Sequence, residues 1–318
     1  MTRRIGDARH LPLGSGAEFD AIRSMLHEWG PRALGIGDDA AVLDVPLGER
    51  LVASTDASVE GVHFRREWLS SEEIGARAAT AALSDLAAMA AMPIGLLLAL
   101  GVPEHWQSEL TDVARGVGRS AERAGCPIVG GNVTRARDLS LTITVLGAAT
   151  QPLHRAGARA GDALYVTGTL GGPGAALHAL QSGRVPAPEH MTRFSSPTAR
   201  IAEARWLAAA GASAAIDVSD GLAADAAHLA RASGVTMEIE AARVPRMGGI
   251  PAHDALASGE EYELLVTFPP DAMPSETAFE SAFALPLTRI GVVRQSGSEP
   301  VRVTGARVDP ARGHDHLS

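Results

Sequence analysis

An irregular alternation of strand-like and helix-like segments along the chain constrains the fold more than any other feature of the sequence. Residues 139–148 alternate apolar and polar side chains, the pattern of a strand with one buried face. Residues 108–124 instead repeat apolar side chains at helical spacing and end before Gly125, a typical helix C-cap. Because strand and helix patterns occur in both halves of the chain, the sequence predicts an α/β (α+β) fold and excludes an all-β protein or a helical bundle.

The same patterns predict the individual elements and a domain boundary. Helices are expected over residues 15–29, 72–92, 108–124, 198–210 and 222–233. Strands are expected over residues 51–53, 94–100, 128–129, 139–148, 164–167, 235–239, 262–268 and 288–293. The length of 318 residues suggests two domains, and a turn-rich stretch at 150–161 separates the halves. We therefore expect domains at 1–150 and 151–318.

Composition excludes several classes of protein. The chain has no lysine, so all 28 basic residues are arginines, and neither a Walker A lysine nor a lysine Schiff base is possible. The one cysteine, Cys126, excludes an intrachain disulfide and a multi-cysteine zinc site. The net charge of −9 argues against nucleic acid or an anionic membrane as the main partner. The sequence shows no signal-peptide pattern and no apolar run long enough to cross a bilayer, so we expect a cytoplasmic protein.

Carboxylates lie at the ends of apolar segments or within an apolar helix rather than on polar faces. The main examples are Asp39, Asp56, Asp85, Asp217, Asp220 and the pair Glu260 and Glu261. Two unit charges about 6 Å apart at an effective dielectric near 20 repel by about 3 kcal/mol. Summed over the pairs of a converged cluster, this repulsion exceeds the roughly 5–15 kcal/mol that stabilises a typical protein. Such a cluster therefore needs cations or bound protons, and oxygen ligands favour Mg²⁺, commonly with substrate phosphates. Otherwise the carboxylates are scattered.

Each of these residues also has a purely structural interpretation. Ser219 or Asp220 is suited to cap the helix that follows it. Asp38 and Asp39 are typical of a turn, and Asp85 alone fits a solvated helix position. No single position is specific for a metal site, so the hypothesis depends on the joint pattern.

A glycine-rich segment at 165–174 lies between an expected strand and an expected helix, an arrangement that binds anions. It also matches the Thr-Gly-x-x-x-Gly-x-Gly pattern of short-chain dehydrogenases, but the lysine that this family requires is absent. Tight strand–helix packing is the structural alternative. Taken alone, His63 fits a buried core histidine better than a functional residue, and the histidines at 313–316 fit a chain terminus better than a metal site.

Seven segments, taken in order, resemble the thiamine-monophosphate kinase family. They are GIGDDAAVL (35–43), STDASVEGVHF (54–64), LSDLAAMAAMP (83–93), GGNVTR (130–135), YVTGTLGG (165–172), AIDVSDGL (215–222) and SGEEYEL (258–264). The GDDAAV and SDGL types are shared with a wider superfamily that includes aminoimidazole ribonucleotide synthetase, selenophosphate synthetase and a hydrogenase maturation factor. The VEGVHF and SGEEYEL types are similar to the thiamine enzymes.

The resemblance implies a fold, a reaction and partners. It implies two α/β domains like those of aminoimidazole ribonucleotide synthetase, and a homodimer whose N-terminal domains pair through their sheets. Domain 1–150 would bind ATP and Mg²⁺ and form the dimer, and domain 151–318 would complete the active site. The implied reaction is ATP- and Mg²⁺-dependent phosphorylation of thiamine monophosphate to thiamine diphosphate, the last step of thiamine diphosphate biosynthesis. Transfer would be direct and in line, with no phosphoenzyme and no general base.

The resemblance also implies roles for the residues at matching positions. Magnesium-binding positions are matched by Asp39, Ser54, Thr55, Asp56, Asp85, Asn132, Asp217 and Asp220, of which Asp39, Asp56, Asp85 and Asp217 would be catalytic. ATP-binding positions are matched by Arg155, Ser219, Gly131 and Arg115, and substrate-binding positions by His63, Glu260 and His314. Three of these depart from the family pattern. Asn132 replaces a frequent aspartate, Arg115 an aromatic beside the adenine, and His314 an aromatic that stacks on the substrate.

Other activities are kept as alternatives. Another ATP-dependent ligase or dehydratase of the same superfamily would act on a different small molecule, although the reactive cysteines of the selenium and hydrogenase branches are missing. A nicotinamide-dependent oxidoreductase would use the glycine-rich segment, and a nucleotide sensor would bind ATP without turnover. Turnover of ATP in the presence of thiamine monophosphate distinguishes the kinase from all three.

Overall fold

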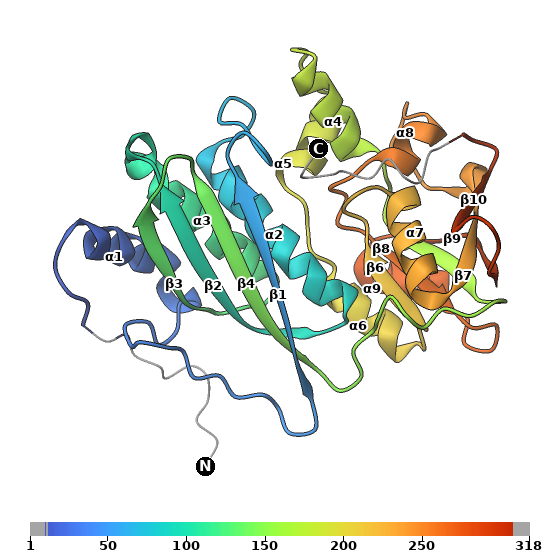
Figure 1. Cartoon of the computed structure of the whole chain (residues 1–318), viewed down its shortest axis with the longest axis horizontal. Helices are drawn as coiled ribbons and strands as arrows, with labels where there is room; N and C mark the ends of the chain where they lie inside the picture. The colour runs from blue at the N-terminus through green and yellow to red at the C-terminus, as the bar shows by residue number, and fades with distance from the viewer. Residues whose placement is uncertain (1–9, 11, 308–318) are drawn as a thin grey trace. The chain divides into compact units, whose positions relative to one another are not determined.

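A computed structural model of the chain describes residue 10 and residues 12–307 (Figure 1). The described chain forms two compact units. The first contains the residues up to Leu86 together with Met92–Gln151, and the second contains Ala87–Ala91 and the residues from Pro152 onward. Each unit has its own sheet and its own helices, so each has its own means of positioning functional side chains.

The first unit is built on a four-stranded sheet. Its elements are α1 (Ala17–Trp29), η2 (Gly30–Arg32), β1 (Arg50–Val59), α2 (Ser71–Ala88), β2 (Met92–Val102), η3 (Glu104–Glu109), α3 (Leu110–Arg123), β3 (Ile128–Arg135) and β4 (Ser140–Ala149). The strand order is β1-β4-β2-β3; β4 runs antiparallel to both of its neighbours, and β2 runs parallel to β3. Helices α2 and α3 cover one face and lie behind the sheet in Figure 1.

The two faces of this sheet differ in burial. Leu141, Ile143 and Val145 on β4 face the helices and are buried, whereas Thr142 between them is exposed. On the edge strand β1, Leu51 on the opposite face is 56% exposed. Among the elements that the structure describes, no helix lies over this second face (Figure 1). The first unit therefore presents an open sheet face as well as an open strand edge.

The second unit is built on a six-stranded sheet. Its elements are β5 (Ala163–Thr167), α4 (Gly172–Gln181), α5 (Pro188–Ser195), α6 (Ile201–Ala209), β6 (Ala214–Asp217), α7 (Leu222–Ser233), β7 (Val235–Glu240), η4 (Ala241–Arg243), α8 (Ala252–Ala257), β8 (Leu264–Phe268), α9 (Glu276–Phe283), β9 (Leu287–Gln295) and β10 (Val301–Thr304). The strand order is β10-β7-β9-β5-β8-β6, with only the β10–β7 pair parallel. Every residue of β5 and β8 is buried, so these strands form the centre of the core.

The predicted fold class is confirmed, but several predicted boundaries are wrong. The helix expected over 72–92 ends at Ala88, because Ala90 adopts a left-handed φ of 53° and Met92 already begins β2. The strand expected over 51–53 continues to Val59, so Ser54, Thr55 and Asp56 lie within a strand rather than after it. These polar residues favour a loop when considered alone, but their pairing with β4 keeps them in the strand.

Two further boundaries differ near candidate functional residues. The segment containing Gly131 and Asn132 lies inside β3, which runs on to Arg135. The strand expected from Tyr262 begins only at Leu264. Short elements such as α5, α8, β6 and β10 were not predicted as such, because four to eight residues carry too little periodicity.

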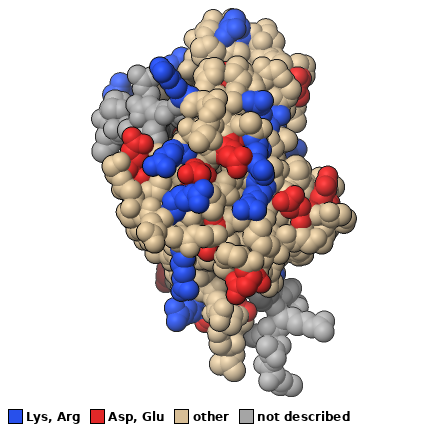
Figure 2. Space-filling model, turned by 90° about the vertical axis from the view of Figure 1, so that its right-hand side faces the viewer, with Lys and Arg blue, Asp and Glu red and all other residues tan. Residues whose placement is uncertain are grey.

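Charged side chains of the second unit pair locally on its surface. Glu238 on β7 forms salt bridges with Arg294 on β9 and with Arg302 on β10. Figure 2 shows arginines and carboxylates interleaved across the face that it views. None of the described helices is long and apolar enough to cross a membrane.

Candidate functional site in two loop systems

Strand β1 and helix α2 bring three candidate magnesium ligands to one side of the first sheet. Alternation along β1 turns Ser54 and Asp56 toward the helices, since they pair with the buried β4 residues Val145 and Ile143. The Ser54 Oγ donates a 2.5 Å hydrogen bond to Oδ2 of Asp85 on α2. Three of the predicted ligands therefore face one side of the sheet, and two of them are in contact.

Other predicted ligands of the first unit do not join this group. Thr55 lies on the open face, where its hydroxyl is 3.0 Å from that of Thr144. Asn132 is exposed on the same face, because it pairs with the exposed Ala99. Asp39 is exposed in the segment before β1, and its N–H donates to Oδ1 of Asp38 at 2.9 Å. Because neighbouring residues of a strand point to opposite faces, Ser54 and Thr55 lie on opposite sides of the sheet although they are adjacent in sequence.

Gly131 and Arg115 have structural explanations in the first unit. A Cβ on Gly131 would collide with the Leu98 carbonyl, so β3 can approach β2 only with glycine at this position. Arg115 on α3 forms salt bridges with Glu28 on α1 at 3.1 Å and with Asp112 at 2.5 Å. The hydrogen bonds that the Arg115 guanidinium donates to Glu28 and Asp112 raise its pKa. The role of both residues in ATP binding stays a prediction.

His63 lies in the turn after β1. Its Nδ1 accepts a 3.1 Å hydrogen bond from the Val59 N–H, which assigns the ring proton of a neutral imidazole to Nε2. The His63 N–H in turn donates to the Val59 carbonyl at 2.9 Å. The turn therefore fixes the ring orientation, and the core-histidine alternative does not hold because His63 is only half-buried.

The strand–turn–helix between β6 and α7 positions the candidates of the second unit. Asp217 ends β6 and is buried, and the Ser219, Asp220 and Gly221 N–H groups all donate to Oδ2 of Asp225 at 3.0–3.1 Å. The helix cap is Gly221 without a side-chain hydrogen bond, so the interpretation of Ser219 or Asp220 as the cap is wrong. Asp225 ties the turn from inside the helix instead.

Asp225 is a residue that the sequence interpretation missed. Burial, together with the negative charges of Asp217 and Asp220, raises its pKa to about 8. The three carboxylates of this turn therefore lie close enough to repel one another. Its only signal in the sequence was an aspartate among alanines, the same signal that identified Asp85.

Glu260 and Arg155 lie on two other loops of the second unit. The Glu260 N–H donates to the Ser219 carbonyl at 2.7 Å, which places Glu260 beside the turn after β6. Arg155 is exposed, and its carbonyl accepts a 2.7 Å hydrogen bond from the Ser233 hydroxyl at the end of α7. His314 lies outside the described residues, as does the segment 313–316.

The glycine-rich segment does form a strand–loop–helix, but a side chain of the protein occupies its anion position. The Gly171 N–H, at the start of α4, donates a 2.5 Å hydrogen bond to Oε1 of the buried Glu261. A Cβ on Gly168 would collide with the carboxylate of Glu263, and one on Gly174 would lie 2.7 Å from the Ser258 hydroxyl. The packing alternative is therefore the better account of these glycines, and the nicotinamide interpretation loses its basis.

The donor atoms suit Mg²⁺ in chemistry, but neither unit holds a complete predicted set. In the described part of the chain, no three histidine, cysteine, aspartate or glutamate side chains are grouped to hold a metal ion. The predicted ligands are divided between the units, with Asp217 and Asp220 in the second and the others in the first. Carboxylate, hydroxyl and amide oxygens are the hard donors that Mg²⁺ prefers. With its pKa raised to about 8, Asp225 can relieve the repulsion in the turn after β6 by holding a proton, and a cation would relieve it as well.

Comparison with known proteins gives the family. Residues 37–149 match the AIR synthase related protein N-terminal domain, and residues 159–304 match the C-terminal domain. A thiamine-monophosphate kinase from Aquifex aeolicus is 34% identical over 96% of this chain and 98% of the relative.

Solved structures agree with this assignment. The thiamine-monophosphate kinase from Stenotrophomonas maltophilia superposes with a TM-score of 0.81 at 34% identity, over 92% of this chain and 97% of that chain. AaThiL complexed with AMPPCP and TMP superposes with a TM-score of 0.74 at 32% identity, over 92% and 94% of the two chains. With both domains matched and nearly full-length relatives aligned, the chain belongs to the thiamine-monophosphate kinase family of AIR synthase related proteins.

Proposed function

We propose that this protein transfers the γ-phosphoryl group of ATP to thiamine monophosphate, forming ADP and thiamine diphosphate. The observation that carries the proposal is the near full-length similarity to thiamine-monophosphate kinases, one of which was solved with AMPPCP and TMP. AMPPCP is an analogue of ATP, so that complex pairs a nucleotide with a thiamine phosphate. In the second unit, the segments that match the family motifs at 168–171, 218–221 and 258–263 lie at strand ends and turns, where such ligands bind.

The proposed step is an in-line displacement at the γ-phosphorus. An electron pair on a phosphate oxygen of thiamine monophosphate forms the new bond to phosphorus. The bond from that phosphorus to the β–γ bridging oxygen breaks, and its electron pair leaves with ADP. A phosphate monoester carries about −1.5 to −2 near neutral pH, so its oxygen needs no general base. Since both reactants are anionic, positioning and charge neutralisation are the main tasks of the protein.

The candidate residues divide these tasks. We assign Ser219 and Arg155 to the phosphates of ATP, because a hydroxyl on a fixed turn and an exposed guanidinium suit that role. We assign His63 and Glu260 to thiamine monophosphate, together with His314. Gly131 and Arg115 remain assigned to ATP, although the salt bridges of Arg115 require that it rearrange to contact a nucleotide.

Magnesium binding is part of the proposal. The oxygens of Asp39, Ser54, Thr55, Asp56, Asp85, Asn132, Asp217 and Asp220 would hold the ions, and Asp39, Asp56, Asp85 and Asp217 would thereby act in catalysis. When bound, Mg²⁺ neutralises charge on the transferring phosphoryl group and its neighbours. The protein contributes preorganised oxygens such as the Ser54–Asp85 pair and the Asp225-tied turn.

We also propose a homodimer formed through the sheets of domain 1–150, with domain 151–318 completing each active site. The open face and the unpaired edge of β1 support this arrangement, because an uncovered ten-residue edge strand invites pairing. A reaction that consumes ATP suits the cytoplasm. Neither nucleic acid nor a membrane is a partner in this proposal.

The test is turnover with defined acceptors. ADP release is followed in a coupled assay with ATP and Mg²⁺, using thiamine monophosphate, thiamine or no acceptor. We expect ADP release with thiamine monophosphate and little with the other two. No ADP release by folded protein that binds ATP would contradict the kinase and favour nucleotide sensing. Release that depends on an unrelated acceptor would favour another ligase or dehydratase of the superfamily.

A further inference from the structure

The segment Ser258–Glu263 and the glycine-rich loop 168–174 hold each other through two buried carboxylates. Oε1 of Glu261 accepts 2.5 Å hydrogen bonds from the Gly171 N–H and from the Ser258 hydroxyl. The Ser258 hydroxyl also accepts from the Gly174 N–H at 3.0 Å. Glu261 thus ties its own loop to the first turn of α4, where an anion is favoured.

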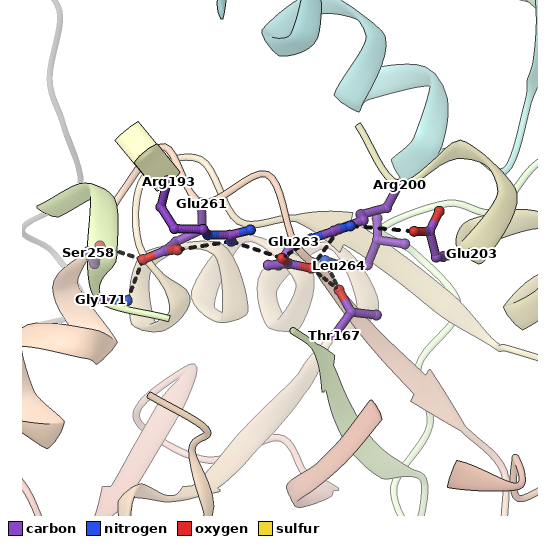
Figure 3. A network of polar contacts seen from close by, with 9 residues as sticks. All are labelled: Thr167, Gly171, Arg193, Arg200, Glu203, Ser258, Glu261, Glu263 and Leu264. Carbon is purple, nitrogen blue, oxygen red and sulfur yellow. Dashed lines mark hydrogen bonds and ion pairs between the residues drawn. The ribbon is translucent and has the colours of Figure 1, made fainter. Parts of the chain in front are cut away.

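Glu263 forms the second attachment. Its Oε2 accepts a 2.6 Å hydrogen bond from Thr167 at the end of β5, and Thr167 Oγ1 accepts from the Leu264 N–H at 2.9 Å. Arg200, just before α6, binds Glu263 at 2.5 Å, and Arg193 on α5 binds it at 2.9 Å. Figure 3 shows Arg193 reaching both carboxylates, with its Nη2 3.7 Å from Glu261. Charges of opposite sign therefore alternate through the buried network.

The backbone between these attachments adopts an unusual conformation. Glu260 and Tyr262 have φ angles of 58° and 52°, although neither is a glycine. A left-handed backbone is strained for a residue with a side chain, and it persists only when its surroundings enforce it. The Glu260 N–H donates to the Ser219 carbonyl at 2.7 Å, and the Tyr262 N–H donates to the Val218 carbonyl at 2.9 Å. The outcome is a loop that turns Glu261 and Glu263 inward and leaves Glu260 half-buried beside the turn after β6.

We infer that Glu261 and Glu263 are positioning residues, and that the glycine-rich loop is an internal socket for their carboxylates that fixes Glu260 for substrate binding. The inference rests on the proposed function, in which Glu260 contacts thiamine monophosphate. The glycines serve the socket because a side chain at Gly168 would occupy the place of the Glu263 carboxylate. Glu261 therefore affects substrate binding only by holding Glu260 in place, and it does not contact the reacting atoms.

Charge state gives the socket a measurable signature. Oε2 of Glu261 is buried without a hydrogen-bond partner among the described atoms, and burial raises the pKa of Glu261 to about 7. Hydrogen bonds from Ser258 and Gly171 and the charge of Arg193 oppose this shift, and the charge of Glu263 adds to it. Above this pKa the carboxylate gains the attraction of Arg193 but bears the larger cost of burying its charge, so the hold on the loop changes as pH rises through this range.

The test compares Glu261→Gln with two other glutamate-to-glutamine variants. Glu260→Gln changes the proposed substrate contact itself, and Glu238→Gln removes a surface salt bridge of the same unit. For Glu261→Gln we expect the KM for thiamine monophosphate to rise about tenfold while the KM for ATP stays within about twofold. Glu238→Gln should change neither. We expect the ratio of variant to wild-type KM to differ between pH 6 and pH 8, because only wild type titrates at Glu261.

The outcomes separate the inference from the function it rests on. An unchanged KM for thiamine monophosphate in Glu261→Gln, with Glu260→Gln impaired, would overturn the positioning role and leave the kinase intact. Unchanged KM values in both would remove Glu260 from the substrate site and the inference with it, while wild-type turnover would still support the kinase. If Glu261→Gln does not fold, Ser258→Ala removes a donor to the same carboxylate. We expect it to raise the KM for thiamine monophosphate about threefold, and no rise would overturn the inference.

Discussion

The two units position their acidic groups by different means. In the first, Ser54 projects from a regular strand and Asp85 from a regular helix, and the two meet in a 2.5 Å hydrogen bond. In the second, the turn after β6 is irregular, and its three N–H groups converge on the buried Asp225. In a regular strand or helix, the backbone N–H groups are hydrogen-bonded within the element, and this fixes the side chains. The N–H groups of an irregular turn need another acceptor, here a buried side chain. The second unit therefore depends more on buried charge.

The largest expected effect tests whether both units take part in one reaction. Asp39→Asn in the first unit and Asp217→Asn in the second should each lower kcat by at least about 100-fold, because each would remove a negative oxygen from the proposed magnesium ligands. Both variants should remain folded by circular dichroism. Loss of activity in Asp217→Asn alone would remove Asp39 from the site, and full activity in both would contradict the metal assignment.

Next in size is the dependence of the second unit on buried charge. Glu263→Gln leaves Arg193 and Arg200 with a neutral partner in the interior, and we expect the free energy of unfolding to fall by about 3–5 kcal/mol. The matched surface variant Glu238→Gln should cost at most about 1 kcal/mol. Urea unfolding of both variants measures the difference. Equal losses would show that the network is no more important than a surface pair.

A smaller effect is expected in the pH dependence of stability. The pKa of Glu261 is about 7 in the fold against an ordinary value of 4.5, so between these values only the folded protein keeps the proton. The free energy of unfolding should therefore fall as pH rises through this window, by roughly 3 kcal/mol at most, and level off above it. Glu261→Gln should remove this part of the slope. Urea unfolding of both proteins near pH 5 and near pH 8 checks it, and parallel profiles would contradict it.

The smallest effect concerns the regular elements of the first unit. Ser54→Ala removes the hydrogen bond to Asp85, and we expect stability to fall by only about 1 kcal/mol, because the strand holds its own backbone. Ser58→Ala, on the same face of β1, is the control and should cost less. Thermal unfolding of both variants measures the difference. A loss in Ser54→Ala as large as that in Glu263→Gln would remove the contrast between the units.

The fold class was predictable because period and length identify strands and helices that are long enough. Helix α7 begins and ends where the apolar spacing placed it, at Leu222 and Ser233. The end of α2 was not predictable, since only the structure reveals the left-handed Ala90 that stops the helix before Pro93. Strand β1 was predicted too short because the polar run from Ser54 to Asp56 resembles a loop until its partner β4 is known.

The candidate site was predictable in composition but not in arrangement. The carboxylates predicted a cation-binding chemistry, which stays a prediction, and the opposite faces of Ser54 and Thr55 follow from strand continuation, which the sequence left undecided. The glycine-rich segment was correctly expected to join a strand to a helix, here β5 to α4. That the carboxyl group of Glu261, about ninety residues along the chain, packs at this loop could be learned only from the tertiary fold.

The central claim is that thiamine monophosphate itself receives the phosphoryl group. ATP labelled in its γ-phosphate, incubated with Mg²⁺, thiamine monophosphate and the whole protein, tests this most directly. We predict that the label appears in thiamine diphosphate, in an amount equal to the ADP formed. Label recovered as inorganic phosphate, with thiamine monophosphate unchanged, would contradict the account.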